Sequence, residues 1–498
     1  MNFSKINKAK YDNLAIGVRG GAIAFILKIV SLALALLNQV ILARILGADG
    51  IGQVLLAISV IYMSSQIAKF GMEDAMMRFV PMYMEKGDNA RLKGTIYFTL
   101  KLCFFISLLS ILFVVMLSDF ISIRIFHSEG LIKLLPVAAI TIPASAMRGV
   151  IGGILKGYKD TFRAQLPEFL ISPASRITVF LLLSIKGGKP EFAIYAFLFG
   201  EVLAVILSGI FLLGKLKAIK TQEHGCEYKK FLDVASTMIF TGITLILFTQ
   251  TDLWIVGIYT STEAVGIYGV VTKLVTLIIL PLGVFSIAIP PLMASIHASD
   301  NLSELRKLVR ESTRWILSAT IPIILILVFE GDIILRYVFG EKFTEGYPPL
   351  LILSIGQMVN ASTGLVGYLL QMTGGHRLIM KINIFWGVIN VILNIILVPH
   401  LGILGAAIST AFCLAMGNIA ATFMAYNRLS VFTLAKGIRF DIIFTCSVML
   451  LYVISVYLKS FLFKHIILTI SLIVYMLKSI ARNDIPWRLL LMQFKEVD

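Results

Sequence analysis

The sequence predicts an all-α integral membrane protein of about 14 transmembrane helices, built as two six-helix lobes from an internal duplication plus two C-terminal helices. Three observations predict this class. The 498 residues are 58% hydrophobic and 14% charged, the apolar residues come in blocks of about 20, and short motifs recur at nearly one spacing. A soluble core stops growing at roughly 250–300 residues, so a soluble fold does not hide this much apolar surface. A membrane barrel would instead show alternating segments of about 10 residues.

The candidate spans follow from the helix length that crosses a bilayer. At about 1.5 Å per residue, about 20 apolar residues cross a hydrocarbon core of about 30 Å. The blocks are 19–42, 50–70, 94–117, 134–155, 165–185, 191–213, 232–258, 265–289, 313–329, 347–370, 378–398, 402–424, 440–458 and 462–480. The last two are the least separated, because only Lys459 and Lys464 mark the turn between them.

The basic residues predict which side of the membrane each loop faces. An even number of spans places both termini on one side, and cytoplasmic loops carry the excess of Lys and Arg. With the termini and alternate loops in the cytoplasm, that side holds about 29 cations and the other about nine. We therefore expect a multi-pass protein with both termini cytoplasmic. The same loops account for most of the net charge of +16, so they suit anionic lipid, and nucleic acid is not an expected partner.

Motif patterns disfavour catalysis and cofactor binding. The chain has no Walker A pattern, no glycine-rich dinucleotide fingerprint, no H-E-x-x-H and no nucleophile elbow, so we expect neither an enzyme nor an ATPase. The four cysteines, Cys103, Cys226, Cys413 and Cys446, form no C-x-x-C pair, and no disulfide, metal or other cofactor is predicted. Uphill movement would then draw on an ion gradient or on the membrane potential, at about 2.3 kcal/mol per charge per 100 mV.

One motif from the first 60 residues recurs in the middle of the chain. NQVILARILGADGIGQV aligns with DLWIVGIYTSTEAVGIYGV at an offset of 214 residues, so that Asp49 meets Glu263 and Gly52 meets Gly266. The second copy is expected to form a tight external turn, with Gly266 opening the next helix. Glu263 then complements the N-terminal dipole of that helix.

Two further matches support a duplication. GVIGGILKG at Gly149 aligns with GLVGYLLQM at Gly364 at an offset of 215, and Asp88 aligns with Asp300 at an offset of 212. Three matches in order indicate two homologous halves, and an even number of spans per half makes the repeats parallel, as in many transporters. The predicted parts are an N-terminal lobe at 1–213, a cytoplasmic linker at 214–231, a C-terminal lobe at 232–425, and two extra helices with a cytoplasmic tail at 426–498.

Charged residues inside the spans are the candidate functional residues. A charge at the centre of a span costs about 2.5–3.5 kcal/mol, so such residues usually face a bundle interior or a wet cavity. The deep cations are Lys28, Arg148, Arg176 and Lys273, and the deep acids are Asp252 and Glu201. The positive surplus favours an anion, and guanidinium groups suit phosphate. Nearer the span ends lie Lys69, Glu73, Asp74, Lys101 and Glu168, where snorkelling is a sufficient explanation.

Each deep charge has two interpretations. Asp252 and Lys273 lie about 10 Å below the outer face of one hairpin. They either form a structural salt bridge, or Asp252 serves a cavity as counter-ion to a lysine or as the carboxylate that carries a coupling cation, H⁺ or Na⁺. Arg176 and Glu201 face the same choice across the hairpin of the fifth and sixth spans.

Lys28 and Arg148 have no sequence-near partner, which leaves a cavity or a pairing that the sequence does not display.

Four segments resemble the polysaccharide-transporter family, the oligosaccharide (O-antigen-type) flippases of the multidrug/oligosaccharidyl-lipid/polysaccharide exporter superfamily. They are LARILGADGIGQVLLAISVI, FGMEDAMMRFVPMY, TDLWIVGIYTSTEAVGIYGVVTKL and VPHLGILGAAISTAF. The resemblance covers the whole chain, and the 14 predicted spans agree with it better than the 12 usual in the multidrug branch.

The resemblance implies an activity for cell-surface polysaccharide biosynthesis. A two-lobed bundle with alternating access would flip a polyprenyl-(pyro)phosphate-linked oligosaccharide from the cytoplasmic to the outer leaflet of a prokaryotic plasma (inner) membrane. The family's cationic cavity would correspond here to Lys28, Arg148, Arg176 and Lys273, and Asp252 matches the acid that opens the second half. Other polysaccharide-assembly proteins would be partners.

Two alternatives stay open. A cation-coupled multidrug exporter would place acids in its cavity, and the surplus of deep cations argues against it. A non-transporting membrane scaffold for polysaccharide assembly would tolerate neutralisation of the deep cations, because fold alone does not fix function.

Overall fold

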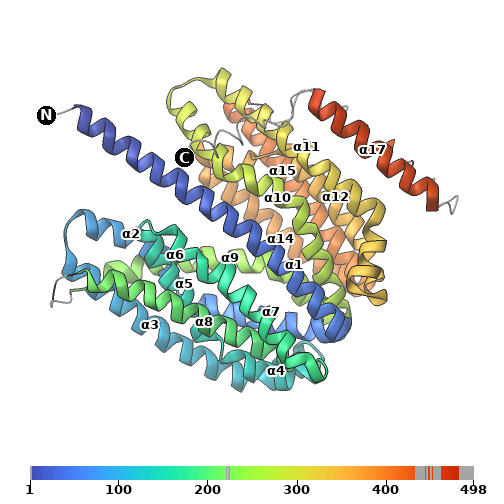
Figure 1. Ribbon diagram of the computed structural model, residues 1–498, viewed down its shortest axis with the longest axis horizontal. Coiled ribbons are helices and arrows are strands. Elements are labelled where there is room, and N and C mark those ends of the chain that lie inside the picture. Colours follow the sequence, from blue (N-terminus) through green and yellow to red (C-terminus); the bar gives the residue numbers. More distant parts are fainter. Residues whose placement is uncertain are drawn as a thin grey trace. The chain divides into compact units, whose positions relative to one another are not determined.

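The computed structural model describes residues 3–219, 221, 225–431, 444, 447–448, 451 and 461–481. Within these residues the elements are helices joined by short turns, without a strand (Figure 1). Among the described residues, eight helices are long and apolar enough to cross a membrane, or up to ten if each of two bent helix pairs is one span. An all-α membrane fold is thus confirmed. The predicted count of 14 is not, and the predicted span 440–458 lies largely outside the described residues.

Breaks within long helices explain part of the lower count. Non-helical backbone at Gly47, with φ 71° and ψ −176°, divides α1 (Phe3–Lys69) at the turn predicted between the first two spans. Phe70 and Gly71 then take positive φ values of 48° and 68° before α2 (Met72–Glu85). The stretch Ile26–Glu85 counts once although it has 60 residues, which would make a helix of about 90 Å, enough for more than one crossing.

The chain divides into two compact units, Met1–Gly269 and Val270–Asp498. After α2 the first unit contains α3 (Asn89–Met116), η1 (Phe120–Ile125), α4 (Gly130–Ala139), α5 (Ile142–Gly157), α6 (Thr161–Leu166), η2 (Pro167–Ile171), α7 (Ser172–Leu183), η3 (Ser184–Lys186), α8 (Pro190–Lys217) and α9 (Tyr228–Tyr259). Helix α8 packs on both α5 and α7, and α1 contacts all three.

Helix α9 packs within the first unit, although the predicted second half begins at residue 232. A Cβ atom on Gly71 would clash with the carbonyl oxygen of Ala235, so the backbone before α2 is in direct contact with the backbone of α9. The indole N–H of Trp254 donates to the Ser59 hydroxyl at 2.7 Å. The compact units and the predicted sequence halves therefore have different boundaries, and the halves stay a prediction.

The turn from α9 to α10 (Thr262–Ala298) is short, as predicted, and Glu263 lies in the first turn of α10. The expectation that Gly266 opens this helix is wrong. The Ser261 hydroxyl accepts a hydrogen bond from the backbone N–H of Ala264 at 3.2 Å, and a serine in this position starts a helix efficiently. Gly266 therefore lies inside α10.

The two motifs paired by the duplication touch each other in the first unit. A Cβ atom on Gly52 would clash with the carbonyl oxygen of Thr262, and a Cβ atom on Gly266 would clash with that of Ala48. The offset of 214 converts Ala48 to Thr262 and Gly52 to Gly266, so the contact is reciprocal, as in a two-fold interface. The Thr262 hydroxyl also donates to the Asp49 carboxylate.

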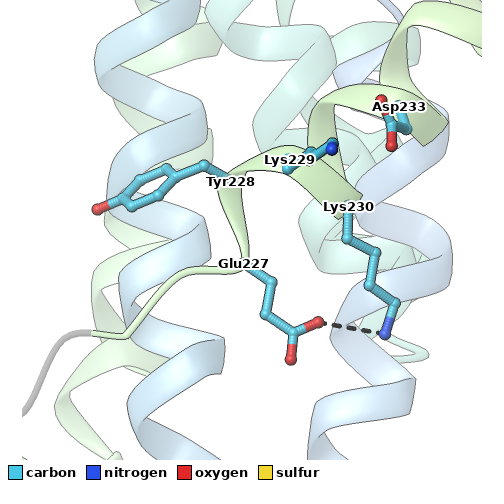
Figure 2. A pocket seen from close by; sticks show the side chains of 5 residues that line it. All are labelled: Glu227, Tyr228, Lys229, Lys230 and Asp233. Atoms are coloured by element: carbon cyan, nitrogen blue, oxygen red, sulfur yellow. Dashed lines mark ion pairs between the residues drawn. The ribbon is translucent and has the colours of Figure 1, made fainter.

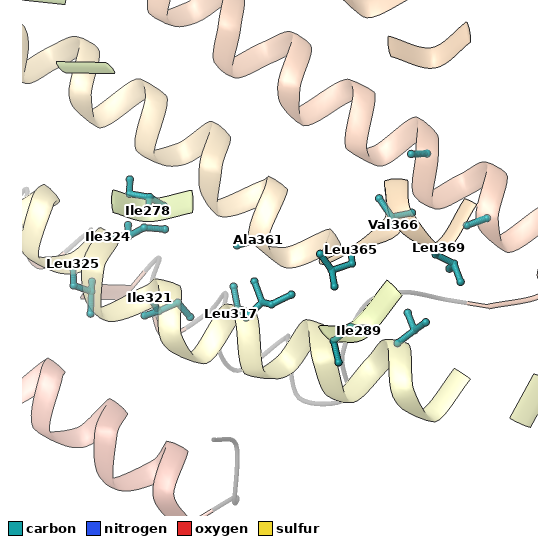
Figure 3. Packing of buried hydrophobic residues seen from close by; sticks show 14 of the residues in the cluster. Ile278, Ile289, Leu317, Ile321, Ile324, Leu325, Ala361, Leu365, Val366 and Leu369 are labelled. Atoms are coloured by element: carbon teal, nitrogen blue, oxygen red, sulfur yellow. The ribbon is translucent and has the colours of Figure 1, made fainter. Parts of the chain in front are cut away.

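The second unit is built around α11 (Leu302–Ile334). The helices that follow it are η4 (Leu335–Phe339), η5 (Glu341–Gly346), α12 (Tyr347–Thr363), α13 (Val366–Met372), α14 (His376–Leu401), α15 (Ile403–Leu429) and α17 (Phe461–Ala481). Figure 3 shows Leu317 of α11 near Leu365, with Ile321 further along the same helix, within one buried apolar cluster. The α14–α15 and α12–α15 pairs complete the bundle.

Helix caps refine the register of the predicted repeat. Asp88 caps α3 by accepting from the Arg91 N–H at 3.0 Å, and Asn301 caps α11 by accepting from the Glu304 N–H at 3.2 Å. The residue before each cap, Gly87 or Asp300, has positive φ. By their caps, Asp88 would pair with Asn301 at an offset of 213, one residue from the predicted pairing with Asp300, and the duplication stays a prediction.

Candidate functional site

A buried glutamate joins three helices of the first unit. Glu201 of α8 is fully buried, and it is the only charged residue that is buried in the described part of the chain. Arg148 of α5 donates from Nε to its Oε2 at 2.9 Å. Arg176 of α7 donates from Nη2 to its Oε1, and the Ser172 hydroxyl donates to the same oxygen at 3.1 Å. These donors compensate the burial of the carboxylate.

A second glutamate reaches Arg148 from an irregular turn. Glu168 lies in η2, a π-helical turn between α6 and α7, and turns of this kind occur frequently at functional sites. Its Oε2 lies 3.2 Å from Nη1 of Arg148. The Glu168 side chain is 42% exposed, compared with 11% for Arg148 and 0% for Glu201. We call Arg148, Arg176, Glu168 and Glu201 the arginine–glutamate cluster.

Close helix packing and an aromatic face position Arg176. A Cβ atom on Gly200 would lie 2.8 Å from Cγ of Arg176 and 2.9 Å from the Ser172 carbonyl oxygen, so glycine lets α7 approach α8. The guanidinium carbon of Arg176 lies 4.1 Å from the centre of the Phe197 ring, a cation–π distance. Phe197 packs edge-on against Tyr62 of α1, with ring centres 6.1 Å apart.

The structure settles which of the predicted pairs form inside this cluster. Arg176 contacts Glu201, the structural pair that is one of the two interpretations of these residues. Arg148, which has no sequence-near partner, pairs with the same carboxylate from 53 residues away. Glu168, which snorkelling alone would explain near a span end, has an ion-pair partner in Arg148. The four charges of the cluster cancel, so the surplus of deep cations is smaller than the sequence indicates.

A second ion-pair group surrounds the break between α1 and α2. The Glu73 carboxylate lies 3.0 Å from Nζ of Lys69 and 3.1 Å from Nζ of Lys156. All three side chains are less than 30% exposed. Lys69 and Glu73 therefore have ion-pair partners in addition to their place near the span ends, and snorkelling stays an untested interpretation for them.

The remaining predicted residues do not join the arginine–glutamate cluster. Lys28 is an exposed residue of α1 and makes no ion pair with a described residue of the first unit. Asp252 accepts a hydrogen bond from the Tyr268 hydroxyl at 3.1 Å. Lys273 is partly buried on α10 and belongs to the second unit. Its pairing with Asp252 of the first unit stays a prediction.

An open hollow of about 580 Å³ lies at the start of α9 (Figure 2). It is lined by Glu227, Tyr228, Lys229, Lys230 and Asp233. Lys230 pairs with Glu227 at 3.1 Å, and the two lysines are matched by two acids. Four of the five lining residues are exposed on the surface, whereas Glu201 is buried among its donors. Because a buried charge is costly and is seldom retained without a function, the arginine–glutamate cluster is the stronger candidate site.

Residues 41–348 match the family described as "Polysaccharide biosynthesis protein". The "Probable low-salt glycan biosynthesis flippase Agl15" of Haloferax volcanii is 26% identical over 242 residues, 48% of this chain and 50% of that protein. The "Probable flippase AglR" of the same organism is 25% identical over 280 residues, 55% of this chain and 57% of that protein. The chain thus spans about half the length of these curated relatives.

A solved structure shows the same fold. The structure titled "Lipid II flippase MurJ, inward closed conformation" superposes with a TM-score of 0.70 at 20% identity, covering 93% of this chain and 99% of that one. The family match spans more than half of the chain and contains Arg148, Arg176 and Glu201, and the resemblance read from the sequence motifs is confirmed. The chain belongs to the polysaccharide biosynthesis protein family.

Proposed function

We propose that the protein is a membrane flippase that moves a polyprenyl-(pyro)phosphate-linked oligosaccharide from the cytoplasmic to the outer leaflet of a prokaryotic plasma membrane. Family membership, the relatives named as flippases and the shared fold support this function. No catalytic step is assigned to it. Both termini are cytoplasmic in this proposal, because the Lys and Arg distribution favours that side.

The observation that carries the proposal is the pair of guanidinium groups held side by side within the matched region. Arg148 and Arg176 share Glu201, yet their side chains keep 11% and 20% exposure. Planar guanidinium donors recognise phosphate oxygens in a bidentate manner. Two such groups on a common buried carboxylate form a preorganised site for a (pyro)phosphate group.

The roles of the acids follow from their contacts. Glu201 accepts three donors, so we assign it as a fixed counter-ion and not as a coupling carboxylate. Asp252 accepts from a phenol and stays the proposed carrier of a coupling H⁺ or Na⁺. Lys28 and Lys273 are proposed to line the substrate path outside the cluster. Alternating access of two lobes is the proposed mechanism, typical of duplicated transporters.

Transbilayer movement of a defined lipid tests this function. The purified full chain is reconstituted in liposomes with a fluorescent prenyl-pyrophosphate disaccharide, and its arrival in the opposite leaflet is timed. The expected result is fast movement of this lipid in liposomes that contain the protein and none in protein-free liposomes, because a charged headgroup does not cross the hydrocarbon core unaided. Equal movement with and without the protein would overturn the proposal.

The cancelled charges of the cluster favour one second candidate, a cation-coupled multidrug exporter. Glu168 is half-exposed, so an acid is accessible where the sequence indicates only a surplus of cations. The same liposomes loaded with a cationic dye distinguish the two functions, because an exporter moves the dye and leaves the pyrophosphate lipid in place.

A further inference from the structure

We propose that Glu168 is a displaceable carboxylate. It occupies Arg148 while the site is empty and leaves when the pyrophosphate group of a substrate binds, which makes it a specificity-determining residue. This inference rests on the proposed function, since it names how the same site selects its anion.

Arg148 is shared between two carboxylates of opposite character. Its Nε faces the fully buried Glu201 at 2.9 Å, and its Nη1 faces the half-exposed Glu168 at 3.2 Å. Glu201 also holds Arg176 and Ser172. Release of Glu201 would leave Arg176 without its carboxylate and Arg148 with Glu168 alone, and breaking a buried ion pair is strongly unfavourable. Release of Glu168 moves a half-exposed carboxylate into solvent, and exposed ion pairs contribute little.

The position of Glu168 on the backbone suits a group that moves. It lies in the π-helical turn η2, directly after Pro167. Pro167 lacks an N–H and cannot take part in helical hydrogen bonding as a donor. By contrast, Glu201, Arg148 and Arg176 lie on the regular helices α8, α5 and α7. Three of the four residues of the cluster are therefore attached to regular α-helices, and only Glu168 is attached to an irregular turn.

The charge balance gives the exchange a direction. With Glu168 in place the four charges cancel, so the cluster does not attract an anion over distance. Without Glu168 the remaining Arg148, Arg176 and Glu201 carry one positive charge, and one guanidinium edge is open. A pyrophosphate, with several oxygens and more than one negative charge, competes for that edge better than a single carboxylate. Glu168 therefore excludes headgroups that carry too little negative charge to displace it from Arg148.

Binding of two probes to the purified full chain tests the exchange. The first probe is inorganic pyrophosphate, and the second is farnesyl pyrophosphate in detergent micelles, so that the free anion and the lipid headgroup are distinguished. Glu168→Gln removes the competing carboxylate and is expected to tighten binding of both probes about tenfold, because attraction replaces repulsion at one guanidinium edge. Adding Arg148→Gln is expected to abolish the gain.

Glu129→Gln is the matched control. Glu129 is an exposed glutamate of the first unit for which no ion pair is found among the described residues, and its loss changes the net charge equally. It is expected to leave binding within twofold of the wild type. A comparable gain in Glu129→Gln would attribute the effect to net charge and overturn the proposal.

Unchanged or weaker binding in Glu168→Gln, or no binding of either probe by any variant, would also overturn it. Should Glu168→Gln fail to fold, Glu168→Asp replaces it, because the shorter carboxylate keeps its charge and loosens the contact with Arg148. The expected gain is then smaller and must still vanish with Arg148→Gln. Tight pyrophosphate binding without lipid movement would contradict the flippase function and leave the exchange intact. Lipid movement together with pyrophosphate binding that Glu168→Gln does not change would support the flippase function and contradict the exchange.

Discussion

The two units bury different kinds of polar side chain. In the first unit, Glu201 is buried with two arginines. In the second, the buried polar residues among those described are hydroxyl and amide side chains, for example Thr320 and Ser354, whose hydroxyls donate to backbone carbonyls of their own helices. In the predicted duplication, the match of Gly149 with Gly364 aligns Thr363 with Arg148 in sequence. The Thr363 hydroxyl donates to the Asn360 carbonyl at 2.9 Å.

The difference separates what supports the fold from what supports the proposed activity. The helix caps Asp88 and Asn301 lie at nearly the same offset as Gly52 and Gly266, the two glycines of the reciprocal contact. The charged cluster has no counterpart at Thr363. A duplicated framework would therefore carry a single anion site, in its first unit. Because charge in the membrane interior is costly, a cluster that persists there is a functional candidate by default.

The largest expected effect is that of Glu201→Gln. This change leaves Arg148 and Arg176 with a neutral partner at the centre of a helix bundle, and breaking a buried pair costs about 3–5 kcal/mol. Thr363→Val in the second unit removes one local hydrogen bond and is expected to cost about 1 kcal/mol. Unfolding free energies in detergent measure both. Equal costs would remove the contrast between the units.

The next effect concerns the reciprocal contact. Gly52→Ala and Gly266→Ala each place a methyl group against a carbonyl oxygen, and overpacking of this kind costs about 1–3 kcal/mol. Gly214→Ala in α8 is the matched control, because a Cβ atom there meets nothing within 4 Å, and alanine favours a helix. Unfolding midpoints should fall for the first two variants and not for the third. An unfolding midpoint that falls for one of Gly52→Ala and Gly266→Ala and rises for the other would contradict a symmetric contact.

The smallest effect is expected at the two caps, and it should be equal in both units. Asp88→Ala and Asn301→Ala each remove a side-chain acceptor from a helix start, at a cost of about 0.5–2 kcal/mol. The same denaturation experiments resolve this loss. A cap that contributes in one unit only would show that the repeated residues have diverged in role.

Much of the fold is readable from the sequence. The helices lie where about 20 apolar residues occur together, and the turn between α9 and α10 follows from its polar residues. The break at Phe70 and Gly71 and the start of α10 at Thr262 depend on local capping and backbone geometry. Periodicity alone does not locate such features.

The candidate site is only partly readable. Arg176 and Glu201 are close in sequence on neighbouring helices, so their pairing is predictable. Arg148 and Glu168 reach the same cluster from other elements, and no local spacing reports such contacts. The one available signal for Glu168 is its place beside Pro167 in an apolar stretch, where a helix is interrupted.

In the proposed function, the arginine–glutamate cluster of the first unit binds the pyrophosphate group of the lipid that is moved. The most direct measurement times prenyl-pyrophosphate disaccharide movement in liposomes for wild type and Arg148→Thr, which installs the residue of the equivalent position. Arg148→Thr with Glu168→Gln restores the charge balance, and Lys133→Thr changes an exposed cation of the same unit. We predict at least a tenfold slower rate in both Arg148 variants and an unchanged rate for Lys133→Thr. Wild-type rates in a folded Arg148→Thr would contradict the account.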